Sequence, residues 1–241
     1  MRKHLLRIFG ILLLIFTVAA GTLLYQGYFR YKREIEVLPI KDAVEAYTSK
    51  EDYVPYEGLD EDFVNAVIAV EDKRFFTRKG YDFVALGRAL YHDLQAGEII
   101  EGGSTITEQI AKNLYLGGYI NGMEEKIAGI YLLFDLEKHY SKQELLALYV
   151  NMNYYGDSYY GISQAAKGYY DASAGDLTLA QAAILAGLPN APSVYQLSTG
   201  YELAKQRLEW VLKTMLDNGW ITEEERIQAP QEDVHPVIKK S

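Results

Sequence analysis

The stretch "AVIAVEDKRFF", residues 66–76, runs from apolar residues directly into an acidic pair. Val64 and Ile68 precede Glu71 by seven and three residues, a spacing that puts the three side chains on one face of an α-helix. Glu71 would therefore lie in an apolar stripe, partly out of water, where a carboxyl group can work as a general acid or base. The other interpretation is an ion pair at the helix end with Lys73 or its basic neighbour. The residue pattern by itself favours that pair, because most such glutamates lie at the surface.

Helical signals extend outward from this stretch along the rest of the chain. Capping boxes, in which a Ser or Thr is followed three residues later by Glu, predict helix starts at Thr105, Ser141 and Thr222. There is no internal repeat and no alternation typical of strands, so the sequence predicts an all-α fold. After the helix that carries Glu71, the predicted helices are 82–96, 105–116, 123–139, 141–151, 161–170, 178–188, 199–217 and a short one from Thr222.

The first 33 residues differ in kind from the rest. Basic residues flank an uncharged, mostly apolar stretch from Ile8 to Phe29, whose 22 residues are enough to span a bilayer as a helix. Small residues at 19–21 would suit a cleaved signal peptide, but the apolar stretch continues past them and is longer than a signal peptide needs. We therefore expect a retained transmembrane anchor. The expected divisions are an anchor in 1–33, a juxtamembrane connector in 34–58, a helical domain in 59–229 and a frayed tail in 230–241.

Charge and cysteine content exclude several classes of function. The formal net charge is −9, and beyond residue 33 the chain carries 18 basic and 33 acidic residues, a net charge of −15. This balance excludes nucleic acid as a partner, because nucleic-acid binding needs a basic footprint. The chain has no cysteine, so it forms no disulfide and uses no thiolate. Its four histidines are scattered, without H-E-x-x-H spacing, and we expect no protein-held metal and no tightly bound cofactor.

A second constellation is "EGGSTITEQIAKNLYL", residues 101–116. Its two glycines allow the backbone to approach a ligand closely, and the helix that follows presents free N–H groups at its start. Further along that helix Gln109, Lys112 and Asn113 share one face. A cation, amide donors and a helix N-terminus around one gap predict a phosphate site. An ordinary turn followed by a capping box accounts for the same residues equally well.

With both constellations in view, the chain resembles glycosyltransferase family 51, the peptidoglycan glycosyltransferases. The first family motif, E-D-x-x-F-x-x-H-x-G, reads EDKRFFTRKG at 71–80, and the second, G-G-S-T-I-T-Q-Q, reads GGSTITEQ at 102–109. Two later blocks also match, "LEKHYSKQELLALYVNMNYYGDSYYGISQAAKGYY" at 136–170 and "DLTLAQAAILAGLPNAPSVY" at 176–195. Because four blocks occur in order, the resemblance is specific. The anchor, the length and the lack of a second domain look like the monofunctional, membrane-anchored members.

This resemblance implies a fold, a reaction and a location. The fold would be a lysozyme-like helical lobe with a smaller membrane-proximal jaw. The reaction would be polymerisation of lipid II, in which the 4-hydroxyl of one disaccharide attacks C1 of the lipid-linked MurNAc, with inversion and release of undecaprenyl pyrophosphate. The chain would be a single-pass protein of the cell membrane, with its N-terminus cytoplasmic and its catalytic domain extracytoplasmic. Its partners would be lipid II, the nascent glycan chain, the cytoplasmic membrane and other cell-wall synthesis proteins.

The resemblance also implies roles for single residues. Glu71 would be the general base on the acceptor hydroxyl. No metal ligand is expected on the protein, and Mg²⁺ would enter only with the substrate pyrophosphate. The predicted substrate-binding residues are Asp72, Phe75, Ser104, Thr105, Gln109, Lys112, Asn113 and Lys126.

The third family motif, R-K-x-x-E, falls on residues 125–129 and departs from the pattern. Lys126 matches, but the arginine is Glu125 and the glutamate is Gly129. Glutamate for arginine reverses a charge where a pyrophosphate is expected, and the missing glutamate would have assisted the leaving group. Elsewhere Arg78 replaces the first motif's histidine and is a candidate to restore the charge lost at Glu125. Gln181 replaces a glutamate in the last block.

Three functions stay open at this point. The first is an active peptidoglycan glycosyltransferase that uses Glu71, which a Glu124 or Glu125 side chain beside Lys126 would favour. The second is a catalytically impaired relative that binds lipid II or glycan strands and scaffolds wall-synthesis enzymes. The third is a glycan-cleaving enzyme, which is disfavoured because the second motif matches transferases and no second hydrolytic carboxylate is identifiable.

Overall fold

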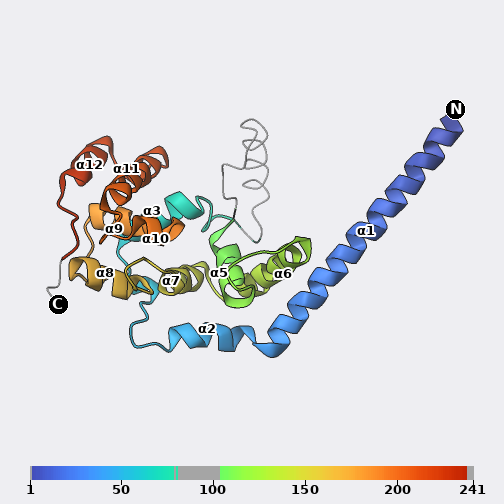
Figure 1. Cartoon of the computed structure of the whole chain (residues 1–241), viewed down its shortest axis with the longest axis horizontal. Coiled ribbons are helices and arrows are strands. Elements are labelled where there is room, and N and C mark those ends of the chain that lie inside the picture. The colour runs from blue at the N-terminus through green and yellow to red at the C-terminus, as the bar shows by residue number, and fades with distance from the viewer. Residues whose placement is uncertain (1, 79, 81–103, 238–241) are drawn as a thin grey trace.

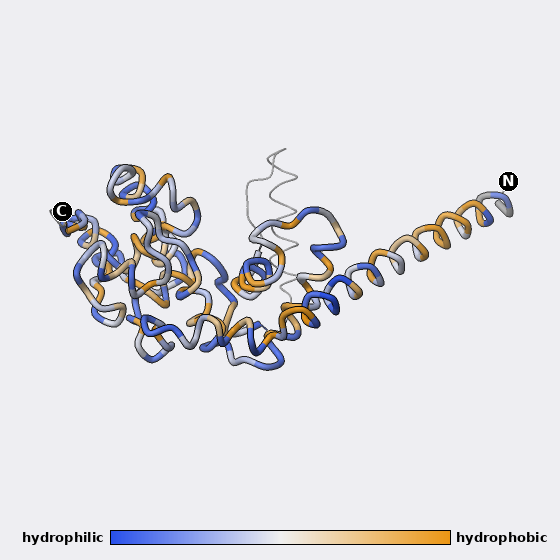
Figure 2. Tube along the Cα trace, turned by 60° about the horizontal axis from the view of Figure 1, so that its bottom comes forward, coloured by the Kyte–Doolittle hydropathy of each residue, from blue (hydrophilic) through white to orange (hydrophobic). Residues whose placement is uncertain are grey.

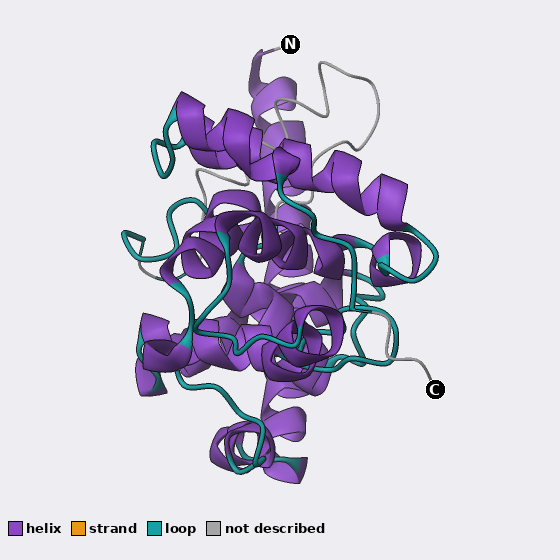
Figure 3. Cartoon of the chain, turned by 90° about the vertical axis from the view of Figure 1, so that its left-hand side faces the viewer, coloured by secondary structure: helices purple, strands orange, loops and turns teal. Residues whose placement is uncertain are grey.

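The structure, a computed structural model, describes residues 2–78, 80 and 104–237 (Figure 1). The helix predicted at 82–96 and the glycine pair at 102–103 lie outside these residues. The described part of the chain consists of helices and loops without a strand (Figure 3), apart from one isolated bridge between Tyr154 and Tyr160. The prediction of an all-α fold is confirmed.

The N-terminal helix α1 (Arg2–Val37) projects away from the rest of the molecule (Figure 1), and hydrophobic residues line its N-terminal half (Figure 2). By length and composition the stretch Leu6–Val37 could cross a membrane, and its most apolar window is not covered by the body. The expected candidate anchor is therefore present as a helix. It continues past residue 33, the end of the predicted anchor, without a break.

Residues 34–58 were expected to form a connector of mixed polarity, but most of them are helical. After α1 come α2 (Ile40–Thr48) and the 3-10 helix η1 (Tyr56–Gly58). Helix α2 buries Ile40 and Val44 and packs against α7 (Lys142–Met152). The Asn151 side chain accepts from the backbone N–H of Val54 at 2.9 Å and donates to its carbonyl at 2.7 Å. This segment is thus part of the body rather than a tether.

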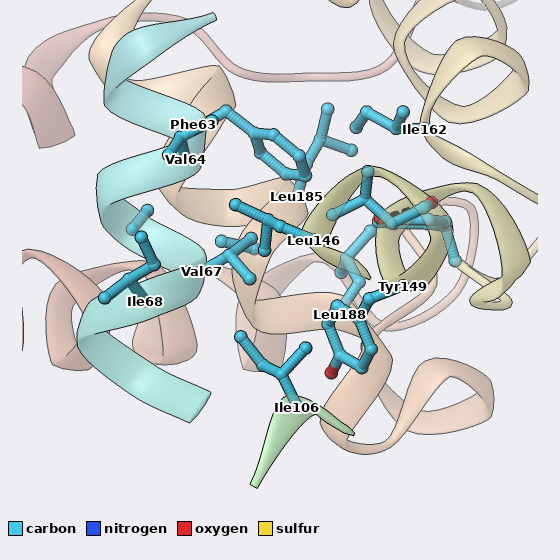
Figure 4. Close-up of a cluster of buried hydrophobic side chains, with 14 of the residues drawn as sticks. Phe63, Val64, Val67, Ile68, Ile106, Leu146, Tyr149, Ile162, Leu185 and Leu188 are labelled. Atoms are coloured by element: carbon cyan, nitrogen blue, oxygen red, sulfur yellow. Dashed lines mark hydrogen bonds between the residues drawn. The ribbon is translucent and has the colours of Figure 1, made fainter. Parts of the chain in front are cut away.

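The core forms around two helices that are far apart in the sequence. Helix α3 (Glu61–Glu71) begins at Asp60, whose carboxylate accepts from the N–H of Phe63 at 3.0 Å. It packs against α9 (Leu179–Gly187) and α11 (Tyr201–Asp217). Seven of the nine residues of α9 are buried, as expected of a central helix. Figure 4 shows the side chains that meet there, among them Phe63, Val67, Leu146, Leu185 and Leu188. This packing holds the C-terminal end of α3, and therefore Glu71, in place.

A second group of helices joins the core to α1. Helix α5 (Ile106–Tyr115) packs on α6 (Met123–His139), and α6 packs on the C-terminal half of α1. Gly27 permits this last contact, since a Cβ there would lie 2.4 Å from Cγ2 of Ile127. The Tyr31 hydroxyl of α1 donates to the Asp135 carboxylate of α6 at 2.6 Å. The helix that carries the third motif therefore rests directly on the candidate membrane anchor.

Of the remaining helices, α8 (Ile162–Tyr170) and α12 (Glu223–Gln228) follow the predicted bounds closely, and the capping boxes at Thr105, Ser141 and Thr222 are all formed. Three short helices were not predicted: the 3-10 helix η2 (Leu188–Asn190), α10 (Pro192–Tyr195) and the 3-10 helix η3 (Ala229–Gln231).

The C-terminal tail does not fray where the sequence predicted. Val234 is 1% exposed, and the N–H of Val237 donates to the carbonyl of Tyr169 at 2.7 Å. The His235 ring stacks on Tyr201 with centroids 3.8 Å apart. Apolar contacts that the composition of the tail does not reveal hold residues 229–237 on the body.

Candidate active site

Glu71 is the last residue of α3 and is half-buried. Its Oε2 accepts a hydrogen bond from Nε2 of Gln109 at 2.7 Å, across 38 residues of sequence. Oε1 of Gln109 in turn accepts from the Tyr149 hydroxyl at 3.3 Å, so both ends of the amide are engaged and its NH₂ is directed at the carboxylate. Among the described residues Glu71 forms no ion pair with Lys73, which is exposed. The structure thus brings the first and second motifs together at Glu71.

Two buried tyrosines lie near the Glu71 carboxylate. Tyr149 is 2% exposed and Tyr155 is 1% exposed. Burial raises the pKa of both phenols well above the ordinary value, and the negative charge of Glu71 raises each pKa further. Both phenols therefore stay neutral at any physiological pH. They give the carboxylate an uncharged neighbourhood on this side, in which the Tyr149 hydroxyl is hydrogen-bonded to Gln109.

Arg207 of α11 is a candidate site residue that the sequence reasoning missed. Its Nε is buried without a hydrogen-bond partner among the described residues, and its guanidinium stacks on Trp210 at 3.9 Å. Burial lowers the pKa of Arg207, while Tyr195 and Glu71 act on it in the opposite direction, which places the cation within electrostatic reach of Glu71. Gly187 leaves room for it, since a Cβ there would lie 2.8 Å from Cγ of Arg207. No local pattern distinguishes this arginine from the other charged residues of α11.

Asp72 and Phe75, both predicted to bind substrate, have buried side chains with partners inside the protein. The Asp72 carboxylate accepts from Arg78 at 2.6 Å and, more weakly, from the N–H of Ile106 at 3.4 Å. Phe75 is fully buried, and the Lys142 ammonium lies 4.6 Å from its ring centroid. Both side chains therefore contact other residues of the protein instead of presenting a surface to a ligand.

The residues predicted on α5 divide into two groups. Thr105 is 3% exposed and caps the helix, accepting from the N–H of Glu108 at 3.2 Å. Ser104 and Asn113 are exposed and Lys112 is half-buried, and the described residues offer Lys112 no ion-pair partner. These three side chains remain available to an anionic ligand. The N–H groups of Thr105, Ile106 and Glu108 at the start of α5 already donate to groups within the protein.

The residues of the third motif point in three different directions. Lys126 is exposed and unpaired within the described ranges. The carboxylate of Glu125 accepts from the N–H of Asn121 at 2.7 Å and lies 3.7 Å from the Arg30 guanidinium of α1. Gly129 is buried, and a Cβ there would lie 3.6 Å from Cδ1 of Leu116. The position of the missing glutamate therefore faces the end of α5, one turn beyond Lys112, whereas Glu125 faces the anchor.

Arg78 does not restore the charge lost at Glu125. Its contacts on α6 are made with Glu137, which lies roughly 18 Å along the helix from Glu125 at 1.5 Å per residue. Gln181 has a local explanation, because it completes the capping box of α9 with Thr178, accepting its N–H at 3.2 Å. Glutamine serves in this motif as well as glutamate does.

No group of three or more potential metal ligands occurs among the described residues. The third motif fits a bound cation poorly, since Gly129 carries no carboxylate and that of Glu125 is turned to Arg30. A cavity of about 750 Å³ between α2 and α7 is lined by Tyr53, Tyr140 and other residues, but by none of the residues of the first three motifs. It lies apart from the chemistry gathered around Glu71.

Comparisons with known proteins agree with the motifs. The family model described as transglycosylase matches residues 39–216. Penicillin-binding protein 1A of Neisseria flavescens is 43% identical over 171 residues, which is 71% of this chain and 21% of that protein. Penicillin-binding protein 1F of Bacillus subtilis (strain 168) is 37% identical over 194 residues, or 80% of this chain and 27% of that protein.

A crystal structure of penicillin-binding protein 1A from Haemophilus influenzae aligns with a TM-score of 0.45 at 24% identity, covering 77% of this chain and 18% of that one. The chain thus spans roughly a fifth to a quarter of the length of the relatives it matches. The match over residues 39–216, which contains Glu71, Gln109 and both later blocks, shows that this chain belongs to the transglycosylase family, glycosyltransferase family 51.

Proposed function

We propose that this chain is a peptidoglycan glycosyltransferase that polymerises lipid II into glycan strands during cell wall synthesis, with Glu71 as its general base. The observation that carries the proposal is the 2.7 Å hydrogen bond from Gln109 to Glu71. It joins the two motifs that family members share and orients the one carboxylate at the end of a core helix. Membership in the transglycosylase family supports the reaction class.

In the proposed reaction Glu71 takes the proton of the acceptor 4-hydroxyl as that oxygen attacks C1 of the lipid-linked MurNAc. The new O–C1 bond forms on the face opposite the pyrophosphate, the C1–O(phosphate) bond breaks, and undecaprenyl pyrophosphate leaves with the electron pair. The half-buried position of Glu71 beside Tyr149 and Tyr155 keeps bulk water from much of the carboxylate. Such a base contributes about 10² to 10⁴ in rate.

The leaving pyrophosphate needs cations and N–H donors on the other side of the reacting carbon. Ser104 just before the start of α5, Lys112 and Asn113 near its C-terminal end, and Lys126 on α6 supply them in this proposal. Arg207 adds a further cation close to Glu71. A Mg²⁺ ion that travels with the pyrophosphate remains a prediction, and the reaction as proposed uses only the protein's own groups.

The proposal places the chain in the cell membrane. Helix α1 would cross it once with the N-terminus in the cytoplasm, and the body would work outside, where lipid II is displayed. The candidate span at Leu6–Val37 supports membrane attachment. Lipid II, the nascent glycan strand and other wall-synthesis proteins would be the partners.

The test is lipid II polymerisation by the full chain in detergent, comparing Glu71→Gln with Glu61→Gln. Both substitutions remove one carboxylate from α3, but Glu61 is exposed at the opposite end of the helix. We expect Glu71→Gln to lower the rate at least about 100-fold, since a neutral amide cannot accept the proton. Glu61→Gln should change it less than about twofold. Equal rates for the two variants would eliminate Glu71 as the base.

One observation favours a second function, binding of lipid II or glycan strands without catalysis. The third motif offers no carboxylate at Gly129, and Glu125 pairs with Arg30 instead of facing the substrate. If the wild-type chain binds lipid II but makes no glycan, even with Mg²⁺ added, this second function replaces the first. Activity gained by Gly129→Glu would then assign the loss to that single missing carboxylate.

A further inference from the structure

A buried charge cluster begins at Asp72, the residue that follows Glu71. The Arg78 guanidinium donates from Nη2 to Asp72 at 2.6 Å and from Nη1 to Glu137 at 2.9 Å, and it also donates to the carbonyl of Gly80. Glu137 accepts from the Lys142 ammonium at 2.6 Å and from the Thr107 hydroxyl at 2.8 Å. The Arg78 and Asp72 side chains are only 4% and 3% exposed, and that of Glu137 is 9% exposed.

The cluster connects four of the helices around the candidate site, α3, α5, α6 and α7. Asp72 follows Glu71 and also accepts from the N–H of Ile106, at the start of α5. Thr107, one residue further along α5, is bound to Glu137 of α6, and Lys142 opens α7. Gln109, the partner of Glu71, lies two residues beyond Thr107. A shift of the Arg78 side chain would therefore move α5 relative to the end of α3 and change the length of the Glu71–Gln109 hydrogen bond.

We propose that Arg78 is a positioning residue, which sets the geometry between Glu71 and Gln109 through a charge that does not titrate. The activity part of this inference depends on the proposed function, whereas the geometric part does not. A guanidinium offers five donors in a rigid plane and stays charged at every accessible pH. Here it reaches Asp72 with two nitrogens and Glu137 with the third.

Neither histidine nor lysine can take its place. Histidine has at most two N–H donors and loses its charge near neutrality, and lysine keeps the charge but lacks the fork. The charged groups facing Arg78 from the described elements are Asp72, Glu137 and Lys142, and with Arg78 they form a set of two cations and two anions. Removal of the Arg78 charge would leave one buried carboxylate uncompensated.

The test compares the polymerisation rates of Arg78→His and Arg78→Lys with that of the wild-type chain between pH 5.5 and 8.5. The quantity followed at each pH is the ratio of the variant rate to the wild-type rate. A histidine between two carboxylates has a raised pKa, so its contribution is present at low pH and is lost as pH rises through that value. We expect the ratio for Arg78→His to fall at least about tenfold from pH 6 to pH 8.5. Arg78→Lys should show a ratio that does not vary with pH, with kcat lowered about tenfold and KM nearly unchanged.

Arg226→His is the matched control, because Arg226 pairs with Glu223 at the surface of α12. Its ratio should stay near one at every pH. A purely structural role for Arg78 would lower the rates of both variants equally at all pH values, and that result would overturn the inference. It would also be overturned if Arg78→Lys had wild-type kcat.

A second measurement does not depend on activity. The chain has no cysteine, so spin labels can be attached at Lys73→Cys and Asn113→Cys, two exposed positions on either side of the Glu71–Gln109 contact. We expect a narrow distance distribution in the Arg78 protein at pH 6 and pH 8. With histidine at position 78 it should broaden only at pH 8. If the unlabelled wild-type chain makes no glycan but the labelled Arg78→His protein shows this broadening, the proposed function fails while the positioning role stands. Unchanged distributions would refute the positioning role.

Discussion

The two ends of α6 make opposite use of charged residues. At its C-terminal end Glu137 belongs to the buried cluster of Arg78, Asp72 and Lys142, which supports Glu71. At its N-terminal end Glu125 is turned away from the motif residues of α5 and pairs with Arg30 of α1. The first end ties α6 to α7 and to Asp72, the residue after Glu71. The second end, which carries the third motif, contacts α1.

This contrast shows why the departures from the family motifs have unequal consequences. Arg78, in place of histidine, is accommodated by four acceptor atoms and strengthens the buried cluster. Glu125 and Gly129 instead lie where α6 packs against α1 and α5, and in the proposed reaction they offer no group to the departing pyrophosphate. The proposed site would thus keep its base oriented while its leaving-group side is weakened.

The largest effect should follow from breaking the C-terminal end of α6 with Glu137→Gln. Removing one member of a buried charge network costs about 3 to 5 kcal/mol, which would lower the midpoint of thermal unfolding in detergent by roughly 6 °C or more. Burial alone would raise the pKa of Glu137, but the hydrogen bonds from Lys142 and Thr107 outweigh it and the pKa is lowered. The carboxylate therefore stabilises the fold above the pKa of a free glutamate, about 4.3, and that contribution is lost as pH falls further.

The difference in midpoint between wild type and Glu137→Gln should accordingly be large at pH 7 and shrink below about pH 4. Asp217→Asn is the control, because it breaks an ion pair with Lys213 in which both side chains are exposed. It should shift the midpoint by about 2 °C at most. If Glu137→Gln shifted the midpoint no more than this control does, the buried cluster at the C-terminal end of α6 would not stabilise the fold as described.

An intermediate effect is expected at the anchor contact from Gly27→Leu. Its Cβ would lie 2.4 Å from Ile127 Cγ2, so α1 and α6 must separate, at a cost of roughly 1 to 3 kcal/mol. Gly21→Leu makes the same change on the same helix where nothing lies within 4 Å. Thermal unfolding of both in detergent should show a lower midpoint for Gly27→Leu alone. Equal midpoints would show that α1 and α6 do not depend on close contact at Gly27.

The smallest effect concerns the missing glutamate position, through Gly129→Ala. A Cβ there meets Leu116 at 3.6 Å, an ordinary contact, and alanine favours a helix interior over glycine by about 1 kcal/mol. We expect the unfolding midpoint to rise by about 2 to 4 °C. Gly168→Ala should instead lower it, since its Cβ would lie 2.2 Å from the Tyr159 ring. A fall with Gly129→Ala would show that α6 and α5 are too close for any side chain at this position.

Local sequence signals predicted the helices well. Helix α6 occupies residues 123–139 as predicted, and the boxes at Thr105, Ser141 and Thr222 cap α5, α7 and α12. These signals act over one or two turns, so they can be read from neighbouring residues. The tail was misjudged because Val234 is buried by residues far from it in the sequence. Glu71 and Gln109 were both selected from their motifs, but their 2.7 Å contact was not foreseen.

By itself, then, the sequence determined an all-α chain with an apolar N-terminal helix, the bounds of most helices from α5 onward and its family, because helix periodicity, caps and ordered motifs are properties of short segments. Only the tertiary structure decided which partner each charged side chain meets. Arg78 could have faced Glu125 and instead reaches Glu137, Glu125 meets Arg30 of the anchor, and Glu71 meets Gln109. Such pairs join residues that are distant in the sequence, and packing of whole helices, rather than local spacing, brings them into contact.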